Sequence, residues 1–168
     1  MDFPILSSLI LLPIVGSLFI FFNKSSSGNY QNSKYVALFI SFANFLLSIY
    51  LWIIFDRGTI DFQFVENKEW LYGYINYKVG IDGISILFVI LTTFIVPICI
   101  ISVNSTISNR LKDFLIAILI MESLMIGVFC SLDLVVFYLF FEAGLIPMFL
   151  IIGIWGGSRR VYSAFKFF

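Results

Sequence analysis

Hydrophobic residues along this chain gather in five long runs, and polar stretches separate them. A helix needs about 20 consecutive apolar residues to cross a bilayer, and each run approaches or reaches that length. A membrane β-barrel would instead show short segments of alternating polarity. The pattern therefore predicts an all-α, polytopic membrane bundle with five spanning helices, at about Phe3–Phe22, Lys34–Phe55, Ile84–Ile107, Leu111–Cys130 and Leu134–Ile154.

Two further segments belong to this pattern. The longest polar stretch, Asp56–Gly80, contains an alternation of apolar and polar residues at Ile60–Val65, which predicts a short hairpin or an interfacial segment. After the fifth run, a polar turn at Gly156–Arg160 leads into a short apolar segment, Val161–Phe168. We expect this segment to form the opening turns of a sixth helix that a second polypeptide completes.

The composition agrees with a membrane chain. Of the 168 residues, 61% are hydrophobic and 12% are charged, and the mean hydropathy is +1.05. A soluble domain is about half apolar and about a quarter charged. The composition therefore excludes an ordinary soluble protein, predicts the lipid bilayer as a partner and gives no indication of a nucleic-acid partner.

Basic residues predict the orientation of the spans, because Lys and Arg favour the cytoplasmic or matrix side. With five spans, one side receives six basic residues: Lys24, Lys34, Arg110, Lys112, Arg159 and Arg160. The other side receives three: Arg57, Lys68 and Lys78. The N-terminus and the Asp56–Gly80 stretch are therefore expected on the outer side.

Two carboxylates, Glu122 and Glu142, lie near the middle of predicted spans. An ionisable group at a helix centre costs about 2.5–3.5 kcal/mol on insertion scales, and such residues often mark ion or proton paths. A structural role is the alternative, in which the carboxyl stays protonated and hydrogen-bonds a neighbour. For Glu122 both alternatives stay open, and it is a second candidate for proton translocation.

Glu142 has the richer surroundings. Gly144 permits close approach of another helix, and Pro147 frees the backbone carbonyl of Ala143 by removing a donor. A carboxylate beside a locally opened helix is suited to hold water and a shared proton. These neighbours favour a transport role for Glu142.

Other chemistry is weakly indicated. The chain has two cysteines, Cys99 and Cys130, and no His, so no metal site is expected and the cysteines are predicted to be small buried hydrophobic residues. No nucleotide-binding loop or catalytic triad occurs. Asp82, just before the third run, is expected to start that helix by accepting free backbone amides.

Several motifs occur in order along the chain. They are Val79–Ser85, Ile126–Phe129, Asp133, Phe141–Met148 and the pair Trp155-Gly156. With these motifs the chain closely resembles the antiporter-like membrane subunit 4 of respiratory complex I, NADH:ubiquinone oxidoreductase, from about Val79 to the C-terminus.

The resemblance implies a role and a set of partners. In that family the glutamate of the Phe-Glu motif handles protons in the fifth helix and pairs with a lysine in the seventh, which assigns this role to Glu142. It also implies that NADH, FMN, iron-sulfur clusters and ubiquinone are used by other subunits, and that this chain binds no cofactor. The partners would be other membrane-arm subunits of complex I.

This chain corresponds only to the N-terminal portion of a family with about fourteen helices in two inverted repeats. Either this chain is one piece of a split subunit, and a second chain supplies the missing helices and the partner lysine, or it is part of a longer product; the split subunit is the favoured alternative. The alternatives are a subunit of a multi-protein cation/proton antiporter and a non-catalytic membrane scaffold fragment. The absence of a targeting segment fits either an organelle-encoded or a bacterial chain. The Phe- and Ile-rich composition and the apparent splitting of the subunit favour the mitochondrial inner membrane, with the bacterial plasma membrane as the alternative.

Overall fold

Five helices in the computed structural model are long and apolar enough to cross a membrane. The structure describes residues 4–22, 31–71, 75–103 and 110–167. Within these ranges the five helices are α1 (Ile5–Phe22), α2 (Gln31–Ile54), α3 (Ser85–Ser102), α4 (Leu111–Cys130) and α5 (Leu134–Trp155). At a rise of 1.5 Å per residue, helices of about 18–24 residues match a hydrocarbon core of about 30 Å. The predicted spans are confirmed, although the predicted start of the first, at Phe3, and the predicted end of the third, at Ile107, lie outside the described residues.

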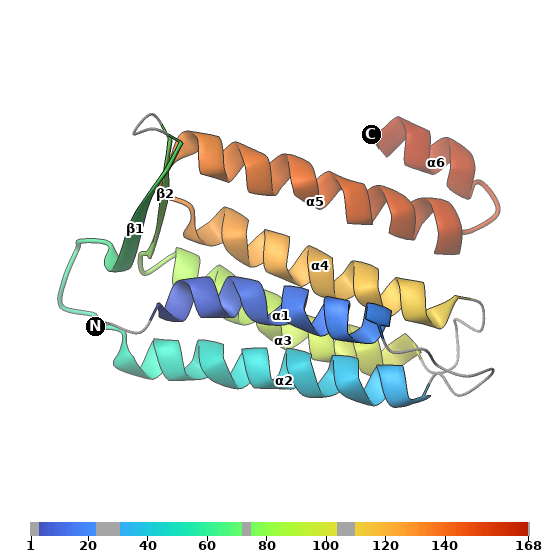
Figure 1. Ribbon diagram of the computed structural model, residues 1–168, viewed down its shortest axis with the longest axis horizontal. Coiled ribbons are helices and arrows are strands. Elements are labelled where there is room, and N and C mark those ends of the chain that lie inside the picture. The colour runs from blue at the N-terminus through green and yellow to red at the C-terminus, as the bar shows by residue number, and fades with distance from the viewer. Residues whose placement is uncertain (1–3, 23–30, 72–74, 104–109, 168) are drawn as a thin grey trace.

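The first four long helices form a bundle, in which α1 packs on α2 and α4, and α3 packs on α2 and α4. The long helices run side by side in Figure 1, with α4 between α5 and the other three. Of the long helices, α5 contacts α4, and its other packed neighbours are the short helix α6 and a strand. The fifth helix is therefore seated on one edge of a four-helix bundle.

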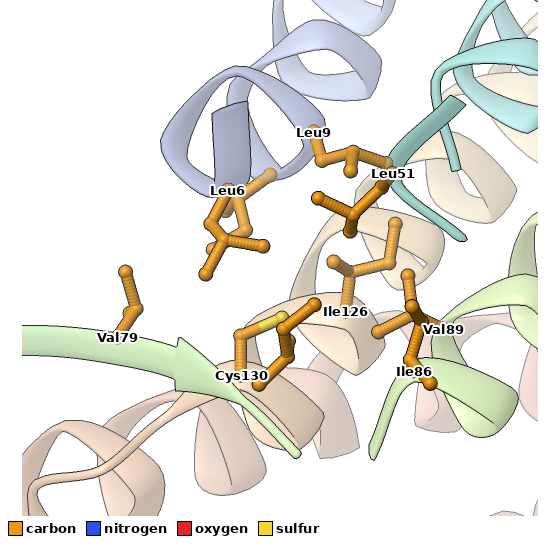
Figure 2. Close-up of a cluster of buried hydrophobic side chains, with 10 residues drawn as sticks. Leu6, Leu9, Leu51, Val79, Ile86, Val89, Ile126 and Cys130 are labelled. Carbon is orange, nitrogen blue, oxygen red and sulfur yellow. The ribbon is translucent and has the colours of Figure 1, made fainter. Parts of the chain in front are cut away.

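Two apolar clusters fill this bundle, one toward each end. The cluster in Figure 2 brings together Leu6 and Leu9 of α1, Leu51 of α2, and residues from α3, α4 and a strand. The second cluster, which includes Ile20, Ile100 and Leu119, joins α1, α3 and α4 near the opposite end. Buried hydroxyl and amide groups lie between the clusters along α2, at Ser41, Asn44 and Ser48.

A β-hairpin covers the end of the bundle where α1 begins (Figure 1). Strands β1 (Gln63–Leu71) and β2 (Ile75–Ile81) pair antiparallel, with Glu66 opposite Val79. A hydrogen bond joins the hairpin to the turn between α4 and α5: the amide of Leu132 donates to the carbonyl of Lys78 at 2.9 Å. The hairpin expected in the long polar stretch is thus present.

Glu66 fastens this hairpin to the first helix. Its Oε1 accepts hydrogen bonds from the backbone amides of Leu6 (2.9 Å) and Ser7 (3.2 Å). The Ser7 hydroxyl donates to Oε2 and lies 3.2 Å from the Tyr77 hydroxyl of β2. Burial raises the pKa of Tyr77. Since the first amides of a helix have no partner within it, the hairpin caps the start of α1 through Glu66.

Two aspartates begin the helices that follow the hairpin and the α4–α5 turn. Oδ1 of Asp82 accepts from the amides of Ile84 (3.2 Å) and Ser85 (2.7 Å), as its sequence position predicts. Hydrogen bonds from the side chain and backbone of Ser85 lower the pKa of Asp82. Asp133 caps α5 in the same way, accepting from the amides of Val135 and Val136.

Two lysines contact helix ends on the side opposite the hairpin. Lys112 Nζ donates to the carbonyl of Phe21 at 2.9 Å, and Lys34 Nζ donates to the carbonyl of Ile101 at 3.4 Å. These contacts bring the end of α1 to the start of α4, and the start of α2 to the end of α3. The described basic residues therefore divide between the two ends of the bundle as the sequence predicts.

The segment after α5 forms the short helix α6 (Arg160–Phe167), which turns back over the end of α5 (Figure 1). The two helices touch at Gly153, where an added Cβ would lie at the ordinary contact distance of 3.6 Å from the Cβ of Ala164. Phe149 and Phe165 pack edge to face across the pair, with ring centroids 6.0 Å apart. The predicted opening turns of a sixth helix are thus helical.

Candidate functional site

Glu142 lies on the helix of the bundle that is least covered by the rest of the chain. Only two residues of α5, Val136 and Pro147, are buried, whereas ten residues of α4 are buried. Glu142 is exposed, and the exposed apolar residues Phe141 (49%) and Ile146 (59%) lie on the same helix. The carboxylate therefore stands at mid-span within an apolar surface that the described helices leave open.

A tyrosine lies next to this carboxylate on α5. Tyr138 is four residues before Glu142, one helical turn earlier. Tyr138 is itself 58% exposed. The pair Tyr138–Glu142 thus presents a hydroxyl and a carboxylate on one face of α5, at the i and i+4 positions that share a helix surface.

The helix α5 is unbroken at Gly144 and Pro147. The helix extends from Leu134 through Pro147 to Trp155. At Gly144 an added Cβ would meet only the Cβ of Leu124, at the ordinary contact distance of 4.0 Å. Packing against the described helices therefore does not require a glycine at position 144.

The close approach of α4 and α5 occurs at Gly127 instead. A Cβ added there would lie 2.6 Å from the ring of Phe140. Below this contact, on the hairpin side, a cavity of about 630 Å³ lies between the hairpin and the two helices, and Lys68, Tyr77, Leu139 and Ala143 contribute to its lining. Ala143, the residue after Glu142 on α5, therefore lies at the wall of this cavity.

Glu122 has the opposite environment. Its side chain is fully buried on the face of α4 that points into the bundle, and its Oε1 accepts a 2.9 Å hydrogen bond from Asn44 Nδ2 of α2. The next residue, Ser123, donates to the carbonyl of Ile10 in α1. The structure therefore separates the two candidate acids, one open to the surroundings and the other enclosed by α1, α2 and α4.

Asn44 is the functional-site candidate that the sequence reading missed. It lies in the middle of an apolar span, with Ser41 three residues before it and Ser48 four residues after it. This i−3, i, i+4 spacing places the three polar side chains on one helix face, and all three are fully buried. Polar residues at this spacing within a span were the available signal.

The described residues offer little to a metal or cofactor. No group of three His, Cys, Asp or Glu side chains within the described ranges could hold a metal ion. Cys130 is buried as predicted, but Cys99 is exposed, so that prediction is wrong for Cys99. The reason is the rotation of α3, which turns this thiol away from the other described helices.

Two family models match consecutive parts of the chain. Residues 58–128 match the amino terminus of NADH-ubiquinone oxidoreductase chain 4. Residues 131–168 match the transmembrane family of the NADH:quinone oxidoreductase and Mrp antiporter proteins. The first match contains Glu122, and the second contains Glu142.

Curated relatives extend this similarity. The chain is 57% identical to NADH-quinone oxidoreductase subunit M of Rhodobacter capsulatus over 138 residues, which are 82% of this chain and 27% of the relative. It is 48% identical to NADH-ubiquinone oxidoreductase chain 4 of Marchantia polymorpha over 165 residues, which are 97% of this chain and 33% of the relative. The chain thus spans about a third or less of the length of these relatives.

Solved structures contain the same fold. A chain of respiratory complex I from Thermus thermophilus with bound NADH superposes with a TM-score of 0.77 at 27% identity, over 96% of this chain and 31% of that chain. A chain of an archaeal membrane-bound sulfane sulfur reductase superposes with a TM-score of 0.72 at 18% identity, over 94% of this chain and 24% of that chain. The second likeness concerns the fold alone.

Proposed function

Because the chain belongs to the NADH-ubiquinone oxidoreductase chain 4 family and corresponds to its N-terminal portion, we propose that it works in the membrane arm of an NADH:quinone oxidoreductase. There it contributes to proton translocation coupled to electron transfer from NADH to ubiquinone. The proton-translocating residue in this proposal is Glu142.

A carboxylate at mid-span on an open apolar helix face is the observation that carries the proposal. A charge in that position costs about 2.5–3.5 kcal/mol or more if lipid surrounds it. Such residues therefore face other protein or a water-filled cavity. The open face of α5 provides the surface on which further helices of the subunit would pack, and Glu142 would then lie at that interface.

The proposed partner of Glu142 is a lysine from the region of the family that lies C-terminal to this chain, on the same polypeptide or on a second one. A nearby cation favours the ionised carboxylate, whereas burial without a cation favours the neutral acid. Movement of the ammonium group toward or away from Glu142 would therefore make the carboxyl release or take up a proton. Tyr138 offers a hydroxyl for this exchange.

Redox chemistry belongs to other subunits in this proposal. An iron-sulfur cluster requires about four cysteine ligands, and this chain has two cysteines and no His. The iron-sulfur clusters would therefore be bound elsewhere in the complex, and the proposal places NADH, FMN and ubiquinone on other subunits as well. The contribution of this chain is the protein part of the proton path.

The proposed location is the mitochondrial inner membrane, with the bacterial plasma membrane as the alternative, and the hairpin faces the intermembrane or periplasmic side. Single cysteines at Lys68 and Arg159, both exposed, test the orientation in a Cys99→Ser, Cys130→Ser background. A membrane-impermeant maleimide should label position 68 from the outer side and position 159 from the inner side. Labelling of both positions from the same side would contradict the topology.

A cation/proton antiporter subunit is the second candidate, because the family model that contains Glu142 also includes Mrp antiporters. Purification of the affinity-tagged chain from its native membrane separates the two. The proposal predicts that NADH:ubiquinone oxidoreductase activity copurifies with the tag. Copurification of a complex without that activity, which exchanges cations for protons in vesicles, would support the antiporter instead, and a tagged chain that copurifies with neither would support a scaffold.

A further inference from the structure

The enclosed pair Glu122 and Asn44 is left unexplained by a proton path through Glu142. Both side chains are fully buried, and they join α4 to α2 by one 2.9 Å hydrogen bond from Asn44 Nδ2 to Glu122 Oε1. Buried polar groups in native proteins are nearly always hydrogen-bonded. The remaining atoms of this pair therefore require an explanation.

Each residue of this pair has one buried atom without a hydrogen-bond partner among the described residues: Glu122 Oε2 and Asn44 Oδ1. Asn44 Oδ1 is the carbonyl oxygen of an amide, so it can only accept. An ionised Glu122 has two acceptor oxygens and no donor, whereas a protonated carboxyl has one O–H donor. The two orphan atoms complement each other only if Glu122 carries a proton.

The surroundings supply no cation for an ionised Glu122. Within the helices that pack around it, α1 and α3 contain no Lys or Arg, and α2 contains Lys34. Lys34 lies ten residues before Asn44, and Lys112 lies ten residues before Glu122. Each is therefore about 15 Å away along its helix axis, and the other acids of α4 and α5, Asp113 and Glu142, could only oppose ionisation.

We propose that Glu122 is a protonated acid that forms a closed, two-bond pair with Asn44. Asn44 Nδ2 donates to Oε1, and the proton on Oε2 is donated to Asn44 Oδ1, so that a carboxylic acid and an amide satisfy each other across α2 and α4. The last side-chain torsion of Glu122 is soft, so the carboxyl group can adjust its orientation to form both bonds. The pair keeps its proton, and Glu122 is a positioning residue rather than a relay.

The position of the pair explains what it holds. One residue further along α4, Ser123 donates to the carbonyl of Ile10, so α4 is fixed to α1 and α2 at the same level. Leu124 and Gly127, which follow on α4, face α5. The pair therefore fixes the rotation of the helix on which α5, with Glu142, is seated. The protonation of Glu122 does not depend on the role proposed for Glu142.

Infrared spectroscopy of the assembled complex tests the protonation state directly. The complex is prepared with isotope-labelled glutamate as wild type and as the Glu122→Gln variant, and the two spectra are subtracted. We expect the wild type to show one additional carbonyl band of a protonated carboxyl, which shifts with the label and persists throughout the pH range of activity. Exposed Glu69 provides the matched control, since Glu69→Gln should remove a carboxylate band instead. Loss of only a carboxylate band in Glu122→Gln would overturn the proposal.

Variants of the pair test the two-bond geometry. Gln at position 122 offers the same donor and acceptor as a protonated Glu, so Glu122→Gln should assemble like the wild type and pump protons. The swap Glu122→Gln with Asn44→Asp should also assemble, because acid and amide merely exchange sides. Glu122→Leu leaves both polar groups of Asn44 buried and unpaired, and the yield of assembled complex should fall roughly tenfold.

Two results would contradict the account. Wild-type yield of Glu122→Leu would show that the pair contributes nothing to the position of α4. A fully assembled Glu122→Gln complex that oxidises NADH but does not pump would make Glu122 a relay, and the structural assignment would fall.

Discussion

Removal of the Glu66 carboxylate should release the hairpin from the start of α1. Glu66 accepts two backbone amides and the hydroxyl of Ser7 at a half-buried site. Helix caps contribute about 0.5–2 kcal/mol, and hydrogen bonds to charged groups contribute about 1.5–3 kcal/mol each before overlap. Because one carboxylate makes all three bonds, we expect Glu66→Ala to cost about 2 kcal/mol, which corresponds to about 30-fold in the opening equilibrium.

Hydrogen exchange measures this opening. In the assembled complex, the amides of Leu6 and Ser7 should exchange about 30-fold faster in Glu66→Ala than in the wild type. The control is Glu69→Ala, which removes an exposed carboxylate from the same strand and should leave both amides protected. Equal protection of Leu6 and Ser7 in Glu66→Ala and wild type would refute the argument that the hairpin caps α1.

Two further predictions concern helix packing and helix starts. Gly127→Ala should force the ring of Phe140 aside and cost about 1–3 kcal/mol, which a lower thermal inactivation temperature of the complex would reveal; an unchanged temperature would show that α5 moves freely. Hydrogen bonds from Ser85 lower the pKa of Asp82, so the stability that Asp82 provides is present above its ordinary value of 3.8 and is lost as the pH falls further toward the native pKa. In the wild type, the hydrogen-exchange protection of the Ser85 amide, corrected for intrinsic exchange rates, should decrease as the pH is lowered below this value. In Asp82→Asn the protection should not decrease with acid in this way.

The sequence predicted the spans well because each one is a long apolar run with a polar end. The α4 bounds, Leu111–Cys130, agree with the prediction at both ends. Asp82 and Asp133 also carry a local signal, since an aspartate before an apolar run is a helix start. The strand bounds were less accessible: alternation indicated Ile60–Val65, whereas β1 begins at Gln63.

The sequence did not predict how the environments of Glu122 and Glu142 differ. A helix that is apolar on all sides has no amphipathic stripe to reveal its rotation, so the sequence did not show which of Glu122 and Glu142 is buried. Packing decides the difference, because α4 is enclosed by other helices while α5 lies at the edge of the bundle. For the same reason, the close contact expected at Gly144 occurs at Gly127, which faces Phe140.

NADH-driven proton pumping by a Glu142→Gln complex in sealed vesicles tests the central claim most directly. Gln keeps the size and hydrogen-bonding capacity of Glu but cannot ionise, and burial of a neutral group costs less than burial of a charge, so assembly should survive. Assembled Glu142→Gln complex should fail to pump protons and should show slower electron transfer, while Glu69→Gln behaves like the wild type. Normal pumping by a fully assembled Glu142→Gln complex would remove Glu142 from the proton path.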